Sequence, residues 1–170
     1  QTVASLKKVR RAEELEQFAL NDSMTGMYNR NAYDYFVKNE KDFEGYVIVT
    51  FDLNNLKQCN DQYGHRAGDE YIINAAHIIE DNFERYGKCY RIGGDEFCCI
   101  IPKGRYFKIE RVMHKIDQDV EVLNHKNIIP VPVGIAYGYA VFTADDTDPE
   151  KVRERADKDM YRNKKTMKQL

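Results

Sequence analysis

Tryptophan is absent from the 170-residue sequence, and proline is scarce, with four residues. No apolar run approaches the ~18 residues that a membrane-spanning helix needs, so we expect no transmembrane segment and no direct membrane contact. The net charge of −2 lacks the positive excess that nucleic-acid binding requires, which argues against nucleic acid as a partner. These absences leave an ordinary globular chain, long enough to bury a hydrophobic core without covalent or metal staples.

Cysteine is also scarce, with residues at Cys59, Cys89, Cys98 and Cys99. None of them stands in a C-x-x-C pair or beside histidines at metal-binding spacing, and the neighbours Cys98 and Cys99 cannot easily bridge each other. We therefore expect reduced thiols that pack as small hydrophobic side chains in a cytoplasmic protein. The chain begins at Gln1 rather than Met, which suggests a piece of a longer protein. The sequence leaves open whether an upstream region anchors that protein to a membrane.

The pattern of apolar residues predicts a mixed α/β domain. The expected elements, in chain order, are helices at 3–20 and 29–38, a strand at 45–51, a helix that follows the polar stretch 53–70 and ends at residue 85, strands at 89–92 and 97–101, a helix at 106–124, a strand-like segment at 128–142 and a last helix that starts with a capping box at 147–150. The order helix, β-α-β-β-α-β, helix is typical of a ferredoxin-like or palm-type sheet flanked by helices.

The first predicted helix has only a thin apolar stripe, which is typical of a connector or a coiled-coil seam. We therefore predict an N-terminal connector helix at 1–20 and a folded domain at 21–170. The connector would lead into the domain from an upstream sensory or dimerising module.

The stretch RIGGDEFCCI at 91–100 places two acids beside a hydrophobic strand. Gly93-Gly94 suits the positive φ angles of a tight hairpin turn, and glycines beside the acids leave room for a bulky anion. In the predicted sheet the first strand and this hairpin can lie side by side, so Asp52 would face Asp95. Carboxylates that converge in this way repel one another unless a cation lies between them, and oxygen ligands suit Mg²⁺ or Mn²⁺. The alternative is a surface hairpin whose acids only maintain solubility.

Four segments of the chain resemble the motifs of one known family, in the family's order and spacing. The segment RIGGDEF resembles the signature of the GGDEF domains, the diguanylate cyclases. The other matches are the family's entry motif, its metal and nucleotide block and its closing helix, which correspond to DSMTGMYNR at 22–30, FDLNNLKQCNDQYGHRAGDE at 51–70 and RADKDMYRNKK at 155–165. The resemblance covers nearly the whole chain and implies the fold of this family.

The resemblance implies that the domain condenses two molecules of GTP into cyclic di-GMP and releases two pyrophosphates. Each domain would hold one GTP, so catalysis would require a homodimer in which each 3′-hydroxyl attacks the α-phosphate held by the other copy. The alternative from a different class is a non-catalytic GGDEF domain that binds GTP or a partner as a regulatory module. A third reading is a cyclase that joins other nucleotide pairs.

The resemblance also implies roles for the acids. Asp52 and the carbonyl of Leu53 match the family's metal ligands, and Asp95 matches the acid that ligates the metal and accepts a proton. Glu96, the second acid, is close enough to assist with the metal or with the hydroxyl. Metal ions neutralise phosphate charge and lower the pKa of a bound oxygen, which agrees with Mg²⁺ or Mn²⁺ as the cofactor.

Nucleotide-binding positions follow from the same resemblance. Phosphate would be held by the backbone N–H groups of one turn and by three lysines. These positions are Asn54, Asn55, Leu56, Lys57, Lys164 and Lys168. Guanine recognition maps to Asn60 and Asp69, because a carboxylate can accept two N–H groups of the guanine edge, where adenine offers no donor. His65 is expected either to contact the nucleotide or to be a structural histidine, and Gly64 and Gly68 are expected to be turn and capping residues.

Two positions depart from the family in a way that concerns product inhibition. Many members carry R-x-x-D shortly before the signature, an Arg and an Asp that hold a dimer of cyclic di-GMP. Glu84 and Gly87 occupy these positions here, so one charge is reversed and one side chain is missing. We therefore predict that the inhibitory site is absent.

Overall fold

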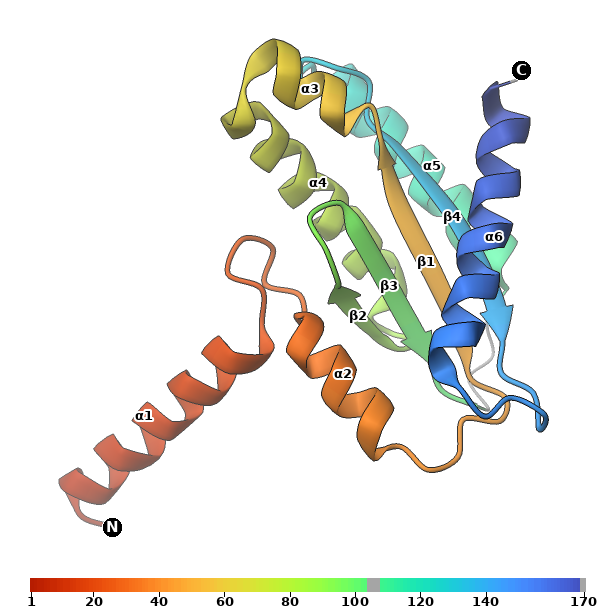
Figure 1. Cartoon of the computed structure of the whole chain (residues 1–170). Helices are drawn as coiled ribbons and strands as arrows, with labels where there is room; N and C mark the ends of the chain where they lie inside the picture. The colour runs from red at the N-terminus through yellow and green to blue at the C-terminus, as the bar shows by residue number, and fades with distance from the viewer. Residues whose placement is uncertain (104–107, 169–170) are drawn as a thin grey trace.

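The described residues form one antiparallel sheet with helices on both faces. The computed structural model describes residues 1–103 and 108–168, with the side chains of the last helix described up to residue 164. The elements are α1 (Val3–Leu20), α2 (Arg30–Asn39), β1 (Val47–Asn54), α3 (Leu56–Tyr63), α4 (His65–Phe83), β2 (Lys88–Arg91), β3 (Glu96–Ile101), α5 (Ile109–His125), β4 (Gly134–Val141) and α6 (Pro149–Lys168). The strand order β2-β3-β1-β4 places β1 and β3 in the centre (Figure 1). The predicted α/β fold with a β-α-β-β-α-β core is confirmed.

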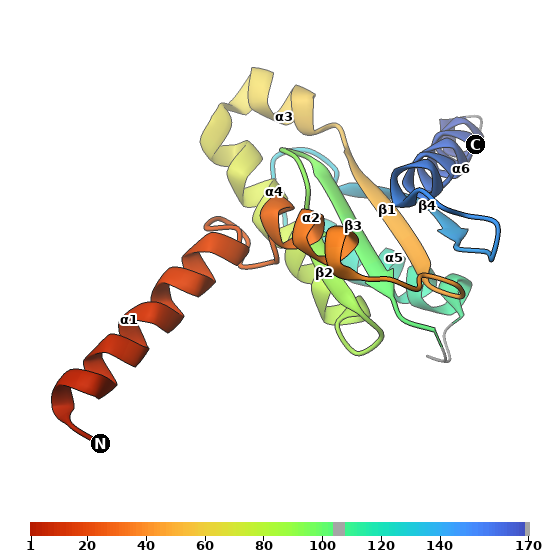
Figure 2. The same ribbon diagram turned by 60° about the horizontal axis from the view of Figure 1, so that its bottom comes forward.

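Successive side chains along each strand point to opposite faces of the sheet, so the hydrophobic core forms two layers. On one face of the sheet, Phe51 and Cys99 pack among the apolar residues of α4 and α5. On the other face, Cys98 packs with α2 and α6, where Val152 and Ala156 are fully buried. Figures 1 and 2 show these two pairs of helices on opposite sides of the strands. The sequence neighbours Cys98 and Cys99 therefore belong to different layers.

Strand β1 is longer than its apolar run predicts. The run ends at Phe51, yet β1 continues through Asn54 because its last residues also pair with β4. The sheet thus carries Asp52 inside a paired strand rather than in the loop after it. A polar residue at the end of a central strand can extend the ladder, since the backbone supplies the hydrogen bonds.

The polar stretch after β1 is helical. It forms α3 and the first part of α4, which are separated by Gly64 at a φ of 87°. This left-handed backbone ends α3 and lets α4 start in a new direction, so the expected turn role of Gly64 is confirmed. Only Leu56 and Cys59 of α3 are buried, too few apolar positions to show a helical period in the sequence.

The last strand begins later than expected, because Pro130 and Pro132 interrupt the apolar run before it. β4 starts only at Gly134. Proline has no N–H group to donate to a sheet ladder, which accounts for the irregular segment that precedes the strand. Helix α5 begins at Ile109, and the expected start of this helix at Tyr106 lies outside the described residues.

Helix α6 has a different cap from the predicted one. The capping box would place Thr147 at the cap, whereas the helix starts at Pro149 and the carboxylate of Asp148 accepts a hydrogen bond from the N–H of Glu150 at 3.0 Å. The side chain of Glu150 pairs with Arg153 instead of closing the box. Proline suits the first helical position, since the N–H group that it lacks would have no partner within the helix.

Helix α1 projects from the rest of the domain as an arm (Figures 1 and 2). It has no buried residue, and Phe18 is 82% exposed. The division into a connector at 1–20 and a catalytic domain at 21–170 stays a prediction. Within the described ranges, no helix combines the length and the apolar character that crossing a membrane would take.

Candidate functional site

The signature acids and Asp52 lie at one end of the central strands. Strands β1 and β3 pair Asp52 with Glu96, and Asp95 precedes Glu96 in the hairpin turn. A cavity of about 330 Å³ opens between this end of the sheet and α6, and its lining includes Arg153 and Asp157 in addition to the three acids. The structure thus brings together Asp52, Asp95 and Glu96, as the predicted sheet requires.

The hairpin turn differs from the prediction in its backbone. The N–H groups of Ile92 and Gly93 both donate to the carbonyl oxygen of Glu96, at 2.9 and 3.3 Å. Neither Gly93 nor Gly94 has a positive φ, so the predicted left-handed turn is wrong. A Cβ at Gly93 would lie 3.3 Å from Oε2 of Glu96, whereas a Cβ at Gly94 would meet open space. Space around the acids, rather than a left-handed backbone, is what these glycines provide.

Arg91 holds the signature turn to the entry motif of the domain, a contact that sequence reasoning missed. Its Nη1 donates to both carboxylate oxygens of Asp22, at 3.1 and 3.2 Å, and its Nη2 donates to the carbonyl of Gly94 at 2.9 Å. Burial alone would raise the pKa of Asp22, but hydrogen bonds from Thr25 and Arg91 outweigh it and lower that pKa below 3.8. Both residues stand in the matched motifs, which is the signal that could have paired them.

Lys164 of α6 forms an ion pair with the carboxylate of Asp52. The ammonium group therefore supplies positive charge where a cation was predicted. The donors at this place, Asp52, Asp95 and Glu96, are all oxygens, and this chemistry fits Mg²⁺ or Mn²⁺. Among the described residues, however, no three metal-binding side chains are gathered closely enough to form a ready-made site. A metal would have to draw Asp52 away from Lys164.

The predicted phosphate turn joins β1 to α3. Asn55 has a left-handed backbone at a φ of 63° and makes no capping hydrogen bond through its side chain, so the first N–H groups of α3 receive no bond from that cap. The hydroxyl of Tyr71 accepts from the N–H of Gly134 at 2.9 Å and contacts the carbonyl of Asn54, which anchors the turn. Burial raises the pKa of Tyr71 to about 12, so this hydroxyl stays protonated near neutral pH.

The lysines of the predicted phosphate site are spread over two helices. Lys57 is exposed in the first turn of α3, and Lys164 reaches the acids from α6. Lys168 is the last residue of α6, and its side chain lies outside the described part of the structure. The structure therefore places two of the three predicted lysines on either side of the acids and the turn.

The predicted guanine residues lie where α3 meets α4. A Cβ at Gly68 would lie 1.8 Å from Oδ1 of Asn60, so the amide of Asn60 packs directly on the backbone of α4. Gly68 is a buried residue inside α4, and the prediction that it is a turn or capping residue is wrong. Asp69 and His65 are exposed on the first turns of α4, and His65 makes no hydrogen bond to another described residue.

The inner wall of the cavity contains polar residues that sequence reasoning did not assign. The hydroxyl of Thr50 is buried and has no hydrogen-bond partner in the described part of the chain. Asp157 and Arg153 of α6 face the same cavity. Burial raises the pKa of Asp157 above its usual value. Asp157 belongs to the closing motif at 155–165, so a signal for it was present in the sequence.

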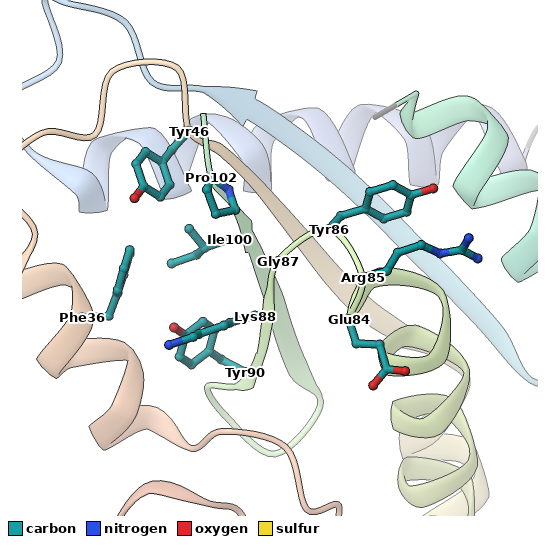
Figure 3. Close-up of a pocket in the computed structure, with 10 residues that line it drawn as sticks. All are labelled: Phe36, Tyr46, Glu84, Arg85, Tyr86, Gly87, Lys88, Tyr90, Ile100 and Pro102. Carbon is teal, nitrogen blue, oxygen red and sulfur yellow. The ribbon is translucent and has the colours of Figure 1, made fainter. Parts of the chain in front are cut away.

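The two positions of the family's inhibitory motif lie just after α4 and next to strand β3. A Cβ at Gly87 would lie 2.1 Å from the carbonyl oxygen of Ile100. Figure 3 shows Glu84 on the opposite side of Gly87 from Phe36 and Tyr90. The backbone at 87 therefore approaches β3 too closely for any side chain, and an Asp does not fit there without a shift of the chain.

Comparisons with known proteins identify the family of the chain. The family described as "Diguanylate cyclase, GGDEF domain" matches residues 19–169. The diguanylate cyclase DgcS of Shewanella oneidensis is 29% identical over 158 residues, which cover 89% of this chain and 52% of that protein. The bifunctional diguanylate cyclase/cyclic di-GMP phosphodiesterase MucR of Pseudomonas aeruginosa is 28% identical over 172 residues, which cover 96% of this chain and 24% of that protein. The chain spans about half or less of the length of these relatives.

Solved structures show the same fold. The structure of the coiled coil and GGDEF domain of DgcB from Caulobacter crescentus, solved with cyclic di-GMP, has a TM-score of 0.77 at 24% identity. The alignment covers 96% of this chain and 90% of that structure. The diguanylate cyclase SiaD of Pseudomonas aeruginosa, solved with its activator SiaC, has a TM-score of 0.74 at 23% identity. The alignment covers 96% of this chain and 70% of SiaD. At these identities the likeness concerns the fold alone. The family match over residues 19–169 goes further, and the chain belongs to the GGDEF domain family.

Proposed function

We propose that the chain is the catalytic domain of a diguanylate cyclase, which condenses two GTP into cyclic di-GMP and releases two pyrophosphates. The observation that carries this proposal is the pairing of Asp52 with Glu96, which sets the acid of β1 beside both signature acids. The turn at Asn55 begins directly after the same strand. One end of the sheet thus offers carboxylates and free N–H groups side by side, as a nucleoside triphosphate with its metal requires.

Nucleotide binding would use both sides of the turn. The triphosphate would lie against the N-terminus of α3, with Lys57 and Lys164 as its cations. Guanine would then reach the junction of α3 and α4, where Asn60 and Asp69 can hydrogen-bond its edge. The ion pair between Lys164 and Asp52 would be exchanged for contacts to phosphate when the nucleotide binds.

The acids would hold a divalent metal and move a proton. Asp52, Asp95 and the carbonyl of Leu53 would hold Mg²⁺ or Mn²⁺, which when bound neutralises phosphate charge and lowers the pKa of a nearby hydroxyl. Asp95, assisted by Glu96, would accept the proton of the attacking 3′-hydroxyl.

The condensation needs two copies of the domain because each copy holds one GTP. In each transfer the 3′-hydroxyl loses its proton to a carboxylate, and its oxygen forms a bond to the α-phosphorus of the other GTP. The bond from that phosphorus to the bridging oxygen of pyrophosphate breaks. Two such transfers close the ring and release two pyrophosphates.

Replacement of the first signature acid tests the proposal. We expect the wild-type chain to convert GTP into cyclic di-GMP with Mg²⁺ or Mn²⁺, and Asp95→Ala to lower the rate by about 100-fold or more. The product can be measured by chromatography. Asp81→Ala, which removes an exposed acid of α4, is the control and should retain activity. Wild-type protein that binds GTP and metal but makes no product at any protein concentration would contradict the proposal.

The second candidate is a non-catalytic GGDEF domain that binds GTP as a regulatory module. The ion pair of Lys164 with Asp52 favours it, because this pair already neutralises the carboxylate that a metal would need. A regulatory module of this kind would bind GTP equally well with and without Mg²⁺. The same measurements therefore separate the two functions.

A further inference from the structure

A groove runs between α2 and the edge strand β2, away from the acids. Two adjoining cavities of about 250 and 380 Å³ form it, and Phe36, Lys88 and Tyr90 line both of them. The first cavity extends toward Gly87 and Ile100, as Figure 3 shows. Neither the acids of the signature nor the phosphate turn contributes to these cavities.

Aromatic rings form the walls of the groove. Between ring centroids, Phe36 lies 6.1 Å from Tyr46, which lines the first cavity, and Tyr28, which lines the second, lies 5.6 Å from Tyr90. Rings in fixed positions offer flat apolar surfaces on which another ring can stack or pack edge to face. This wall chemistry favours a planar ligand over a flexible aliphatic one.

Two polar groups in the groove, the hydroxyl of Tyr90 and the ammonium of Lys88, lack a hydrogen-bond acceptor or a carboxylate partner among the described residues. Tyr90 is only 2% exposed, and its hydroxyl makes no hydrogen bond to any described residue. Lys88 pairs with no carboxylate in the described part of the chain, and its ammonium lies 5.5 Å from the centre of the Tyr28 ring. The hydroxyl of Tyr90 is not among the fully buried atoms that lack a partner, so it reaches the open space of the cavities that Tyr90 lines, where a ligand atom can accept its hydrogen bond.

Strand β2 places the side chains of Lys88 and Tyr90 on the same side of the sheet edge. Lys88 and Tyr90 are two residues apart in β2, so their side chains leave the same face of the strand. Figure 3 shows both on the side of β2 where Phe36 lies. Burial raises the pKa of Tyr90, so its hydroxyl remains a hydrogen-bond donor at neutral pH. An ammonium and a donor hydroxyl side by side suit one small anionic group.

We propose that this groove binds a small aromatic carboxylate. Its ring would lie between Phe36 and the tyrosines, and its carboxylate would accept hydrogen bonds from Lys88 and from the hydroxyl of Tyr90. Glu84 and Glu40 stand at the rims of the two cavities and disfavour ligands that carry several negative charges.

A matched pair of probes tests the charge of the ligand, with no nucleotide present. Indole-3-acetate and tryptamine share one ring system and differ in the sign of their charge. In NMR titrations of the whole chain we expect indole-3-acetate to bind with a dissociation constant of about 1 mM or lower, with shifts centred on β2 and α2, and tryptamine to bind at least about tenfold more weakly.

Variants test the two polar groups. Lys88→Met, which keeps the length of the side chain, should weaken binding of indole-3-acetate about tenfold, and Tyr90→Phe should weaken it by a smaller factor. Lys126→Met, at the end of α5, is the matched control and should bind as the wild type does. Thermal melting establishes that each variant is folded.

Several results would overturn the proposal. These are the absence of binding by indole-3-acetate, equal binding of tryptamine, or unchanged binding by folded Lys88→Met and Tyr90→Phe proteins. Displacement of the probe by micromolar cyclic di-GMP would overturn it as well, because the groove would then be a site for the product.

Discussion

Gly87 and Gly68 each allow a neighbouring group to lie against the backbone, where a single methyl group would prevent the contact. The neighbouring group is a backbone carbonyl at Gly87 and a side chain at Gly68, so the consequences of substitution differ. A Cβ at 87 would lie 2.1 Å from a backbone carbonyl of β3, and a Cβ at 68 would lie 1.8 Å from the side-chain oxygen of Asn60. A side chain can rotate away from a clash, whereas a strand in the centre of a sheet cannot move without the loss of its pairing. Substitution at 87 should therefore affect stability, and substitution at 68 should affect what Asn60 can bind.

Gly87→Asp would place an acid at the position that the family uses for product inhibition. We expect it to lower the free energy of unfolding by about 2–3 kcal/mol, because the new side chain overlaps the backbone of Ile100. We expect no cyclic di-GMP site to appear. Denaturant unfolding and calorimetry measure the two effects. Gly94→Ala, where a Cβ meets open space, should cost less than about 1 kcal/mol. A stable Gly87→Asp protein that binds cyclic di-GMP would contradict this expectation.

The ion pair between Asp22 and Arg91 predicts a pH dependence of stability. The pKa of Asp22 is lower in the folded chain than its ordinary value of 3.8, so ionised Asp22 stabilises the fold above that value. This contribution is lost as the pH falls through the lowered folded pKa. Asp22→Asn should therefore be less stable than wild type near neutral pH, with a difference that shrinks in strong acid. Urea unfolding at several pH values measures this difference. Asp34→Asn, in an exposed pair with Arg30, should show little difference at either pH.

At the scale of elements, the short helix α3 and the first turns of the long helix α4 replace the polar stretch that the sequence predicted after the first strand. Helix α3 begins at the proposed phosphate turn, where Asn55 gives no side-chain cap, and Gly64 redirects the chain between α3 and α4. The guanine positions come from both helices, so their spacing depends on how the two helices pack. The contact between Asn60 and Gly68 sets how closely the two helices approach.

Gly68→Ala should therefore impair nucleotide binding more than catalysis. The added methyl group displaces the amide of Asn60, and we expect KM for GTP to rise about tenfold with a smaller change in kcat. Steady-state cyclase assays at constant metal concentration measure both parameters. In an Asn60→Ala background the same change should add little, since the amide is already gone. An unchanged KM in the single variant would show that Asn60 does not contact the base.

At the scale of the whole molecule, the proposed active site is only half complete. One chain supplies one set of acids and, in the proposed function, one place for GTP, while the apolar residues of α1 are exposed. A reaction between two bound nucleotides then depends on how often two domains meet. This dependence distinguishes the proposed cyclase from an enzyme that works as a monomer.

The rate of cyclic di-GMP formation per chain should increase with protein concentration. If the active species is a dimer, as proposed, the rate per chain should rise in proportion to concentration well below the dissociation constant and level off above it. Assays over a wide range of dilutions, compared with sedimentation data, measure both. A rate per chain that stays constant while the protein is monomeric would exclude the two-copy mechanism.

Much of the site could be located from sequence, since the motifs mark individual residues. Asp52 was expected opposite the signature acids, and the antiparallel pairing of β1 with β3 places it there. The partners of Arg91 and Lys164 were not predicted, because each lies far away in the sequence, at Asp22 and Asp52, and motif membership alone does not give a contact. The turn at Gly93 was predicted wrongly, because glycine was assumed to be needed for its φ rather than for space.

The sequence by itself determined the family, the order of the elements and the identity of the candidate catalytic residues, because apolar periodicity and motif spacing are local properties of a chain. Only the tertiary structure decided that Gly87 has no room for a side chain, that Lys164 neutralises Asp52, and that aromatic residues of α2 and β2 enclose a groove. These features depend on distances between segments remote in sequence. Such distances are set by the packing of the two layers on the sheet.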